Sequence, residues 1–559
     1  MLGLTYIQVM ASLQLPDYMA KVVNEGIVGE NQSLIWSTGL KMLLVTGIGA
    51  VSTVIVGFFS ARIGTGFSKT LRKEVFTKVE AFSLTEFNKF SIASLITRST
   101  NDIQQVQMVV IIIFRMVLSA PIMGIGAIIK ANQMAPSMTW IMGVAVAVLL
   151  VVITILFVVA VPKFKLVQKL IDTLNLVTRQ NLTGLRVIRA FNTEDFEEKK
   201  FDLVNKEVTN INLFVNRIMV VMQPVMMLIF NLTTIGIIWV GAHLINTNDL
   251  QIGDMMAFMQ YAMQVIMSFL MISIIFILVP RAAVSAQRIS EILDVDPAIV
   301  DPKTPKKSKG KKGGTVEFNN VTFSYPDADV PVLYNISFTA KPGETTAIIG
   351  GTGSGKSTVV NLIPRFFDVT SGEILIDGVD IRDMRQKDLH SKIGYIPQKG
   401  VLFSGTIESN IKYGRPNAEK KEVKNAAKIA QATEFIKKLK EGYNSPIAQG
   451  GANISGGQKQ RLAVARALVT RPNIYIFDDS FSALDFKTDS KLRSELKGVT
   501  RDSTVLIVAQ RIGTVLDADQ IIVLEDGKIV GIGKHRELMK KCPVYKEIAL
   551  SQLSEKELE

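Results

Sequence analysis

Cysteine and histidine are nearly absent from this sequence, which has one cysteine, Cys542, and three histidines among its 559 residues. A single cysteine excludes an intrachain disulfide and a thiolate metal cluster, so the globular part is expected to face a reducing compartment. The first residues lack a basic segment and a small-residue cleavage site, so a removable signal peptide is not expected there. No repeat of solenoid length occurs, and a two-fold assembly therefore needs a second chain.

Charged residues are scarce in the first half of the chain, where long apolar segments follow one another. Leucine, isoleucine, valine and methionine dominate six segments, at residues 2–20, 42–59, 109–129, 138–161, 218–244 and 255–279. Each approaches the roughly 20 residues that a membrane-spanning helix needs, so the sequence predicts six spans within a lipid bilayer. The first segment is barely long enough, so it is either a short helix or the end of one that starts upstream.

Basic residues between the spans predict the orientation in the membrane. Residues 62–98 and 163–200 carry many lysines and arginines, whereas the opposite loops hold Lys130 alone. By the positive-inside rule, both basic loops and the second half of the chain are cytoplasmic, in a multi-pass protein of the cell membrane. Apolar residues recur in these loops at helical spacing, so the helices are expected to continue well below the membrane.

From residue 315 the pattern changes to short β-branched segments separated by helical ones, at 316–318, 345–349, 374–376, 474–477, 504–508 and 520–524. This alternation predicts an α/β domain with a largely parallel sheet. We divide the chain into an all-α six-helix transmembrane domain at 1–290, a basic linker at 291–314 and the α/β domain at 315–559. The linker holds six lysines between prolines and glycines: Lys303, Lys306, Lys307, Lys309, Lys311 and Lys312. Such a run is typical of a solvated linker, so no nucleic-acid partner is expected despite the net charge of +13.

A glycine-rich segment after the strand at 345–349 fits the phosphate-binding loop of nucleotide-binding proteins. Its residues are Gly350, Gly351, Thr352, Gly353, Ser354, Gly355, Lys356, Ser357 and Thr358. Small residues let successive N–H groups surround a phosphate at a helix N-terminus, Lys356 neutralises phosphate oxygens, and the Ser357 hydroxyl can bind Mg²⁺. Asp478 ends the buried strand at 474–478 and is expected to lie beside that Mg²⁺. ATP and Mg²⁺ are the predicted cofactors.

A second anion-binding motif, Ile454-Ser455-Gly456-Gly457-Gln458, precedes a strong helical segment. With it the chain resembles the ABC transporter family, whose signature usually has leucine where Ile454 stands. The resemblance implies that Ser455, Gly456, Gly457 and Gln458 contact ATP held by a partner domain, and that Asp485 faces the opposite site. It also implies that adenine stacks on Tyr325 and that Gln398 senses Mg²⁺.

The resemblance extends to the membrane half. Residues 94–102 and 185–194 resemble the two cytoplasmic loops of exporter-type ABC proteins, with short coupling helices near 88–92 and 192–197. Six helices joined to one nucleotide-binding domain imply a half-transporter. The whole pattern resembles the degenerate-site subunit of bacterial heterodimeric multidrug exporters.

Two catalytic positions depart from the family pattern. Asp479 stands where the family has the glutamate that polarises the attacking water, and it is one methylene shorter, so it should miss the geometry of a general base. Gln510 stands where the family has histidine, and a neutral amide cannot take up a proton in the same way. The residues that bind nucleotide are retained, which favours a site that binds ATP better than it hydrolyses it. The alternative is tolerated drift with normal hydrolysis.

This asymmetry favours a heterodimer with a second ABC half-transporter, because two copies of this chain would form two poor sites. We expect ATP-driven export of amphipathic small molecules, such as drugs or lipids. The alternatives are an ATP-gated channel or regulatory subunit of the same architecture, and a soluble-domain function with the membrane half as an anchor. Methionines at steps of four, from Met255 to Met271, could line a permissive cavity or simply pack between helices. Arg115, a charged residue in a span, is a functional candidate or a snorkelling side chain.

Overall fold

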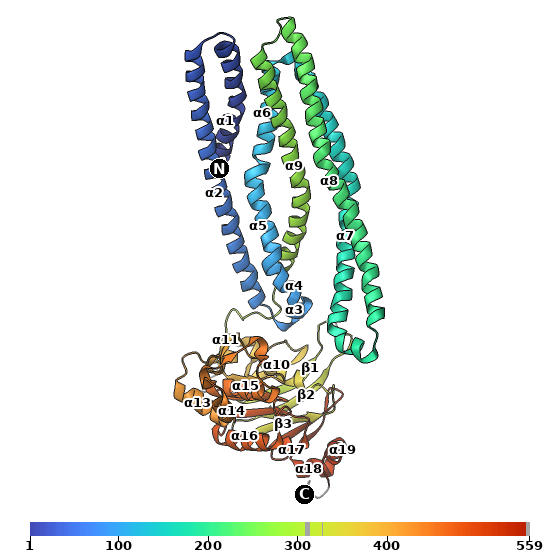
Figure 1. Cartoon of the computed structure of the whole chain (residues 1–559). Helices are drawn as coiled ribbons and strands as arrows, with labels where there is room; N and C mark the ends of the chain where they lie inside the picture. The colour runs from blue at the N-terminus through green and yellow to red at the C-terminus, as the bar shows by residue number, and fades with distance from the viewer. Residues whose placement is uncertain (308–312, 327, 555–559) are drawn as a thin grey trace. The chain divides into compact units, whose positions relative to one another are not determined.

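The computed structural model describes residues 1–307, 313–326 and 328–554, with the backbone alone at 156–157, 160–161, 164–165, 168, 219, 273–274 and 276–277. The chain forms two compact units (Figure 1). The first contains residues 1–79 and 92–294, and the second contains residues 80–91 and 295–559. Lys309, Lys311 and Lys312 of the predicted linker, and the side chains of Lys165 and Met219, lie outside the described part.

The first unit is helical throughout. Its helices are α1 (Leu2–Lys21), α2 (Gln32–Glu80), α4 (Ile92–Thr97), α5 (Ile103–Ile112), α6 (Ser119–Met134), α7 (Thr139–Phe191), α8 (Glu194–Asn246) and α9 (Ile252–Leu293). Two π-helical turns, Arg98–Asp102 and Ile113–Val117, join α4, α5 and α6 into one long helical segment. Helices α7 and α8 have 53 residues each. At 1.5 Å per residue that is about 80 Å, far more than a membrane crossing needs, so the predicted helical extensions are confirmed.

Within the described residues, five helical segments are long and apolar enough to cross a membrane. They contain α2, α4 to α6, the first part of α7, α8 and the first part of α9. Helix α1 is the sixth predicted span and is less apolar, because it carries Gln8, Gln14 and Asp17. Small residues allow these helices to approach closely: a Cβ on Gly126 would lie 2.4 Å from Leu13 Cδ1.

The second unit combines two sheets with short helices, as predicted for an α/β domain. One sheet has the order β12-β11-β3-β10-β9-β6, and the other has the order β2-β1-β4-β5. The strands of the first are β3 (Thr345–Gly350), β6 (Ile393–Ile396), β9 (Ile474–Asp478), β10 (Thr504–Val508), β11 (Gln520–Glu525) and β12 (Lys528–Gly533). The strands of the second are β1 (Val316–Phe323), β2 (Leu333–Ala340), β4 (Ser371–Ile376) and β5 (Val379–Asp380). A short pair, β7 (Gly405–Thr406) and β8 (Pro446–Ile447), is antiparallel.

Five strands of the larger sheet run parallel, with β12 antiparallel at the edge. All five residues of β9 and of β10 are buried, as expected for strands covered on both faces. Strand β10 lies between β3 and β9, so that Val508 is aligned with both Ile348 and Asp478. The carboxyl ends of these three strands therefore meet at one edge, which is where ligands bind in parallel sheets.

The remaining helices belong to the second unit. They are α3 (Leu84–Lys89), α10 (Lys356–Leu362), α11 (Gln386–Ser391), α12 (Ile407–Lys412), α13 (Lys420–Ile429), α14 (Thr433–Lys438), α15 (Gly456–Thr470), α16 (Phe486–Val499), α17 (Ile512–Val515), α18 (His535–Lys541) and α19 (Pro543–Leu550). Helix α3 lies near the expected position of the first coupling helix, and its segment belongs to the second unit. The structure therefore groups residues 80–91 with the second unit, whereas the sequence-based division placed them in the transmembrane domain.

Candidate functional site

The glycine-rich loop begins where β3 ends and finishes where α10 begins, as its sequence predicts. Gly353 and Gly355 have φ angles of +84° and +94°, a left-handed conformation that favours glycine. A Cβ on Gly350 would lie 2.1 Å from the carbonyl oxygen of Leu524, so no larger residue fits there. The loop borders a cavity of about 260 Å³ that is also lined by Gln398, Asp479 and Gln510.

Polar groups of the loop are arranged for an anion and a metal ion. Lys356 Nζ donates to the carbonyl oxygens of Gly350 and Gly351, at 3.0 and 2.6 Å. Ser357 Oγ donates to Asp478 Oδ1 at 2.8 Å, so the two predicted Mg²⁺ ligands are neighbours. The Ser354 hydroxyl is buried and has no hydrogen-bond partner among the described residues. An orphaned donor in this loop fits a phosphate oxygen as its partner.

Asp479 brings together the two positions at which the sequence departs from the expected catalytic pattern. Its Oδ2 accepts hydrogen bonds from Gln510 Nε2 at 2.9 Å and from Gln398 Nε2 at 3.2 Å. Its backbone is held at a φ of +46°, and its N–H donates to the carbonyl oxygen of Val508. Gln552 Nε2 donates to the carbonyl oxygen of Gln510, which fixes the segment after β10. Three predicted site residues thus form one hydrogen-bonded cluster.

Burial governs the electrostatics of this edge. It raises the pKa of Asp478, although the hydrogen bond from Ser357 acts in the opposite direction. Burial also raises the pKa of Asp479, against the hydrogen bonds from Gln398 and Ser482. Conversely, burial lowers the pKa of Lys356, and the charges of Asp479 and Asp478 offset part of that effect. Two carboxylates and one ammonium group in a half-enclosed site form a good environment for a charged ligand with a cation.

Comparisons with known proteins agree with this geometry. Residues 1–269 match the model of the ABC transporter transmembrane region, and residues 333–482 match that of the ABC transporter itself. An uncharacterized ABC transporter ATP-binding protein of Mycobacterium tuberculosis is 41% identical over 552 residues, covering 98% of this chain and 94% of the relative. This chain belongs to the ABC transporter family.

One solved structure and one further relative bear on the architecture of the whole chain. A solved bacterial Atm1-family ABC exporter with ATP bound superposes with a TM-score of 0.82 at 25% identity, covering 99% of this chain and 97% of the exporter. A mitochondrial potassium channel ATP-binding subunit of Rattus norvegicus is 30% identical over 546 residues, covering 96% of this chain and 76% of that subunit. This ABC transporter is an exporter-type half-transporter, a multi-pass membrane protein with a cytoplasmic nucleotide-binding domain. The predicted family, fold class and membrane location are confirmed.

The site of this ABC transporter fits Mg²⁺ and ATP. The described residues contain no cluster of three histidine, cysteine, aspartate or glutamate side chains able to hold a metal ion. A Mg²⁺ ion here would therefore take Ser357, Asp478 and Gln398 from the protein and the rest from phosphate and water, as this ion prefers. When bound, Mg²⁺ neutralises charge on the phosphates. Lys356 and the orphaned Ser354 hydroxyl would hold the phosphates in place.

Several predicted residues do not line the phosphate cavity, among them Ser455, Asp485 and Tyr325. Ser455 caps α15: its hydroxyl accepts from Gln458 N at 3.4 Å, and Gln458 Oε1 accepts from Ser455 N. Asp485 caps α16, with its Oδ1 accepting from Thr488 N at 2.9 Å. Neither group lines the cavity of its own phosphate loop, which fits a role in a partner's site. The Tyr325 hydroxyl is hydrogen-bonded to Thr358 Oγ1 at 3.0 Å.

The structure also brings Tyr395 and Asn361 to the site, which the sequence did not predict. The Tyr395 hydroxyl donates to Asn361 Oδ1 at 2.8 Å and reaches Asp478 Oδ2 at 3.5 Å. Burial raises the pKa of Tyr395, so its hydroxyl stays neutral beside Asp478, the predicted Mg²⁺ ligand. Tyr395 lies on β6, which pairs with β9 in the sheet. This proximity follows from the strand order and has no signal in the sequence around Tyr395.

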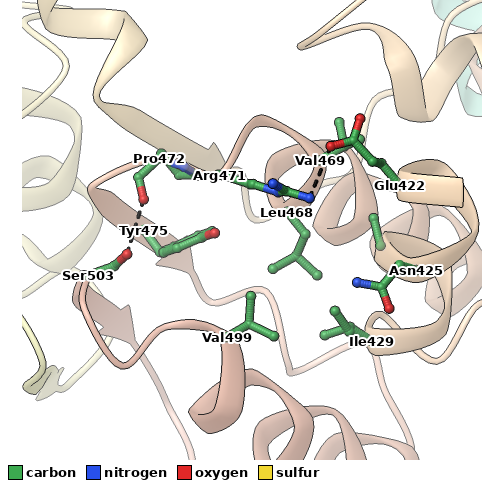
Figure 2. A pocket seen from close by; sticks show the side chains of 11 residues that line it. Glu422, Asn425, Ile429, Leu468, Val469, Arg471, Pro472, Tyr475, Val499 and Ser503 are labelled. Atoms are coloured by element: carbon green, nitrogen blue, oxygen red, sulfur yellow. Dashed lines mark hydrogen bonds and ion pairs between the residues drawn. The ribbon is translucent and has the colours of Figure 1, made fainter. Parts of the chain in front are cut away.

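Figure 2 shows another cavity of the nucleotide-binding unit, lined by residues of α13, of the end of α15 and of β9. Glu422 Oε1 and Arg471 Nη2 form an ion pair of 3.0 Å at this cavity, and the Tyr475 ring forms part of the wall. Its volume is about 160 Å³, compared with about 260 Å³ for the phosphate cavity. It shares no residue with the phosphate cavity.

The methionines predicted to contact a substrate include a pair packed inside the helical unit and an exposed pair. Met255 and Met259 pack against the buried cluster of the helical unit, whereas Met263 and Met267 are 49% and 45% exposed. Arg115 lies in the π-helical turn Ile113–Val117 and is exposed. Gln264 Nε2 donates to the carbonyl oxygen of Ser12 at 3.2 Å. Met255 and Met259 therefore serve helix packing, whereas Met263 and Met267 lie on the surface of the single chain.

Proposed function

We propose that this chain is one half of an ATP-driven exporter of amphipathic small molecules, and that its own site hydrolyses ATP slowly. It works as a heterodimer with a second, different ABC half-transporter, and Mg²⁺ is its cofactor. The partner supplies the phosphate loop and the catalytic glutamate of the competent site. This chain completes that site with Ser455 and the glycines at the start of α15.

The observation that carries this proposal is the bonding of Asp479. One oxygen of its carboxylate accepts from two amide groups, those of Gln398 and Gln510. Both lone pairs of that oxygen are engaged, so it is poorly placed to accept a proton from an attacking water. An aspartate also keeps its carboxylate one carbon–carbon bond closer to the end of β9 than a glutamate would.

No imidazole replaces the missing histidine among the described residues of this cavity. His390 Nε2 is hydrogen-bonded to the carbonyl oxygen of Pro364 at 2.8 Å, and His535 Nδ1 to the Tyr545 hydroxyl at 2.7 Å. Neither side chain lines the phosphate cavity. Gln510 can donate a hydrogen bond to a phosphate but remains neutral, which supports retained binding and weak hydrolysis.

Restoring the expected residues tests the slow site. In the purified pair, with the partner's own site inactivated, Asp479→Glu with Gln510→His should raise the ATPase rate. A correctly placed general base contributes about 10²–10⁴-fold, so we expect a gain of at least about tenfold. The rate of phosphate release is the measurement.

The matched control for this experiment is Asp479→Gln with Gln510→His, which has the same side-chain length without a carboxylate. It should show no gain, because a glutamine cannot act as the base. An equal gain in both double variants, or none in a folded Glu–His variant, would remove the explanation of the slow site.

The amphipathic substrate is supported by the exposed methionines of α9. Met263 and Met267 lie one helical turn apart, and a thioether side chain adapts to apolar partners of different shapes. ATP-dependent accumulation of an amphipathic fluorescent dye in inside-out vesicles containing the pair measures this activity. Vesicles without ATP give the passive background.

An ATP-gated channel is the second candidate. The similarity to a mitochondrial potassium channel ATP-binding subunit favours it, and slow hydrolysis suits slow gating. The same vesicles distinguish the two functions. Accumulation of a solute against its gradient supports the exporter, whereas an ATP-dependent passive ion conductance without accumulation supports the channel.

A further inference from the structure

The segment that follows α9 is held in a fixed path along the nucleotide-binding unit. We call residues 295–302 the strap. Pro297 and Pro302 limit its backbone freedom and remove two N–H donors. Ile299 is only 6% exposed, so the strap packs into the unit at its centre.

Two residues of the ATPase core bind the strap. Gln386, the first residue of α11, donates to Asp301 Oδ1 from its backbone N at 2.9 Å and from its Nε2 at 3.3 Å. Arg365 Nη1 donates to the carbonyl oxygen of Val300 at 3.4 Å. Its guanidinium is buried and oriented by Asp368, at 2.7 and 3.0 Å. The strap is therefore attached to the core at two successive residues.

Glu86 of α3 binds the same strap from another element. Its Oε1 accepts from Ala298 N at 3.2 Å, while Oε2 accepts from Ser83 N at 2.8 Å and from Ser83 Oγ at 2.7 Å. The side chain is 3% exposed. Burial acts to raise the pKa of Glu86, but the bonds from Ser83 and Ala298 outweigh it and hold the pKa below its usual value. A buried carboxylate with three donors is a strong and specific contact.

Arg365, which binds the strap, follows shortly after helix α10 of the nucleotide site. Helix α10 starts at Lys356 and ends at Leu362, whose carbonyl oxygen accepts from Arg365 N at 3.0 Å. Phe366 contacts Tyr395 edge to face, with 5.5 Å between the ring centroids. Tyr395 in turn bonds Asn361 of α10 and reaches Asp478. The same short helix therefore has the phosphate loop at its start and the strap contact just after its end.

We propose that Glu86 is a positioning residue that couples the nucleotide site to the membrane helices through the strap. Residues 81–83 join α3 to α2, and residues 90–91 join it to α4. A shift of α10 on nucleotide binding would pass through Arg365 and the strap to Glu86, and from there along the chain into both helices. This inference rests on the proposed ATP-driven function, because it concerns how nucleotide binding acts on the membrane domain.

Glu86→Gln tests the contact at nearly constant volume. Ala298 and Ser83 bond different oxygens of Glu86, and a glutamine keeps an oxygen at only one of these two positions, so its NH₂ must face one of the donors. Hydrogen exchange of the full-length pair, without nucleotide, should be at least about fivefold faster in the peptide covering 295–302. The matched control is Glu80→Gln, an exposed glutamate at the end of α2.

A second measurement tests the coupling. In the wild-type pair and in Glu80→Gln, Mg²⁺-ATP should change exchange at residues 70–79 and 92–102 by at least about twofold. In Glu86→Gln this response should disappear, while a fluorescent ATP analogue still binds with a Kd within about twofold of wild type. Retention of the response, or unchanged exchange of the strap, would overturn the proposal. Absence of any response in the wild-type pair would overturn the ATP-driven function itself, together with the coupling.

Discussion

At the scale of single residues, the hydrogen bonds and the burial of Asp479 define its state in the nucleotide site. Asp479 is 7% exposed, and its carboxylate is engaged by the side-chain amides of Gln398 and Gln510. The neutral donors stabilise the ionised carboxylate, but burial still makes ionisation costly. Burial is therefore the largest effect on the pKa of Asp479, and it raises that pKa. Without a bound ligand or cation, the ionised Asp479 carboxylate therefore lowers the stability of the folded protein.

Neutralising Asp479 should stabilise the nucleotide-free protein. Because the pKa of Asp479 is raised in the folded state, the folded protein binds a proton more readily than the unfolded chain, and stability falls as pH rises through that window. We expect Asp479→Asn to raise the unfolding temperature by about 1–3 °C at pH 8. The difference from wild type should shrink toward zero as the pH falls to about 4. Thermal unfolding at both pH values measures it, and a constant difference would contradict the assignment.

At the scale of elements, α1 owes its place in the bundle to polar contacts as well as apolar ones. Lys130 of α6 and Asp17 of α1 form an ion pair with 2.7 Å between Nζ and Oδ2. The hydroxyl of Tyr261, on α9, lies within hydrogen-bond distance of two acceptors, Asp17 Oδ1 at 2.5 Å and the carbonyl oxygen of Leu13 at 2.8 Å. Ionisable residues inside a helical bundle are costly unless paired, so these contacts explain why α1 packs with less apolar sequence than its neighbours.

Charge reversal tests that network. Asp17→Lys leaves two like charges beside each other and should destabilise the detergent-solubilised pair by about 1–3 kcal/mol, the range for a partly buried ion pair. Adding Lys130→Asp restores an opposite pair with the positions exchanged and should recover at least about half of the loss. Thermal unfolding of the two single variants and the double variant completes the cycle. Additive losses would mean that the pair does not couple α1 to α6.

At the scale of the whole molecule, the sequence predicted what local patterns encode. Five of the six predicted apolar segments lie in helices that, among the described residues, are long and apolar enough to span a membrane, and the loop from Gly350 to Ser357 borders the phosphate cavity. Both signals lie within short stretches of chain. The ion pair of Lys130 on α6 joins it to Asp17 of α1, and the place of Tyr395 depends on strand order. Likewise, the joint bonding of Gln398 and Gln510 to Asp479 joins segments far apart in the chain. Such contacts have no local signature, so only the structure gives them.

In the proposed heterodimer, Ser455 and Lys356 of this chain serve two different ATP sites, which hydrolyse ATP at unequal rates. Ser455→Arg should lower the ATPase rate of the pair by at least about 100-fold, since it places a bulky cation where the competent site needs a small hydroxyl donor. Lys356→Ala should lower it only a few-fold, about 2–5-fold, because the slow site still has to be filled for the domains to close but contributes little turnover. Phosphate release by the purified pair gives both rates, and nucleotide trapped per pair identifies the site that is occupied. Equal losses in the two variants would mean that both sites turn over, and the asymmetry assigned to Asp479 and Gln510 would be wrong.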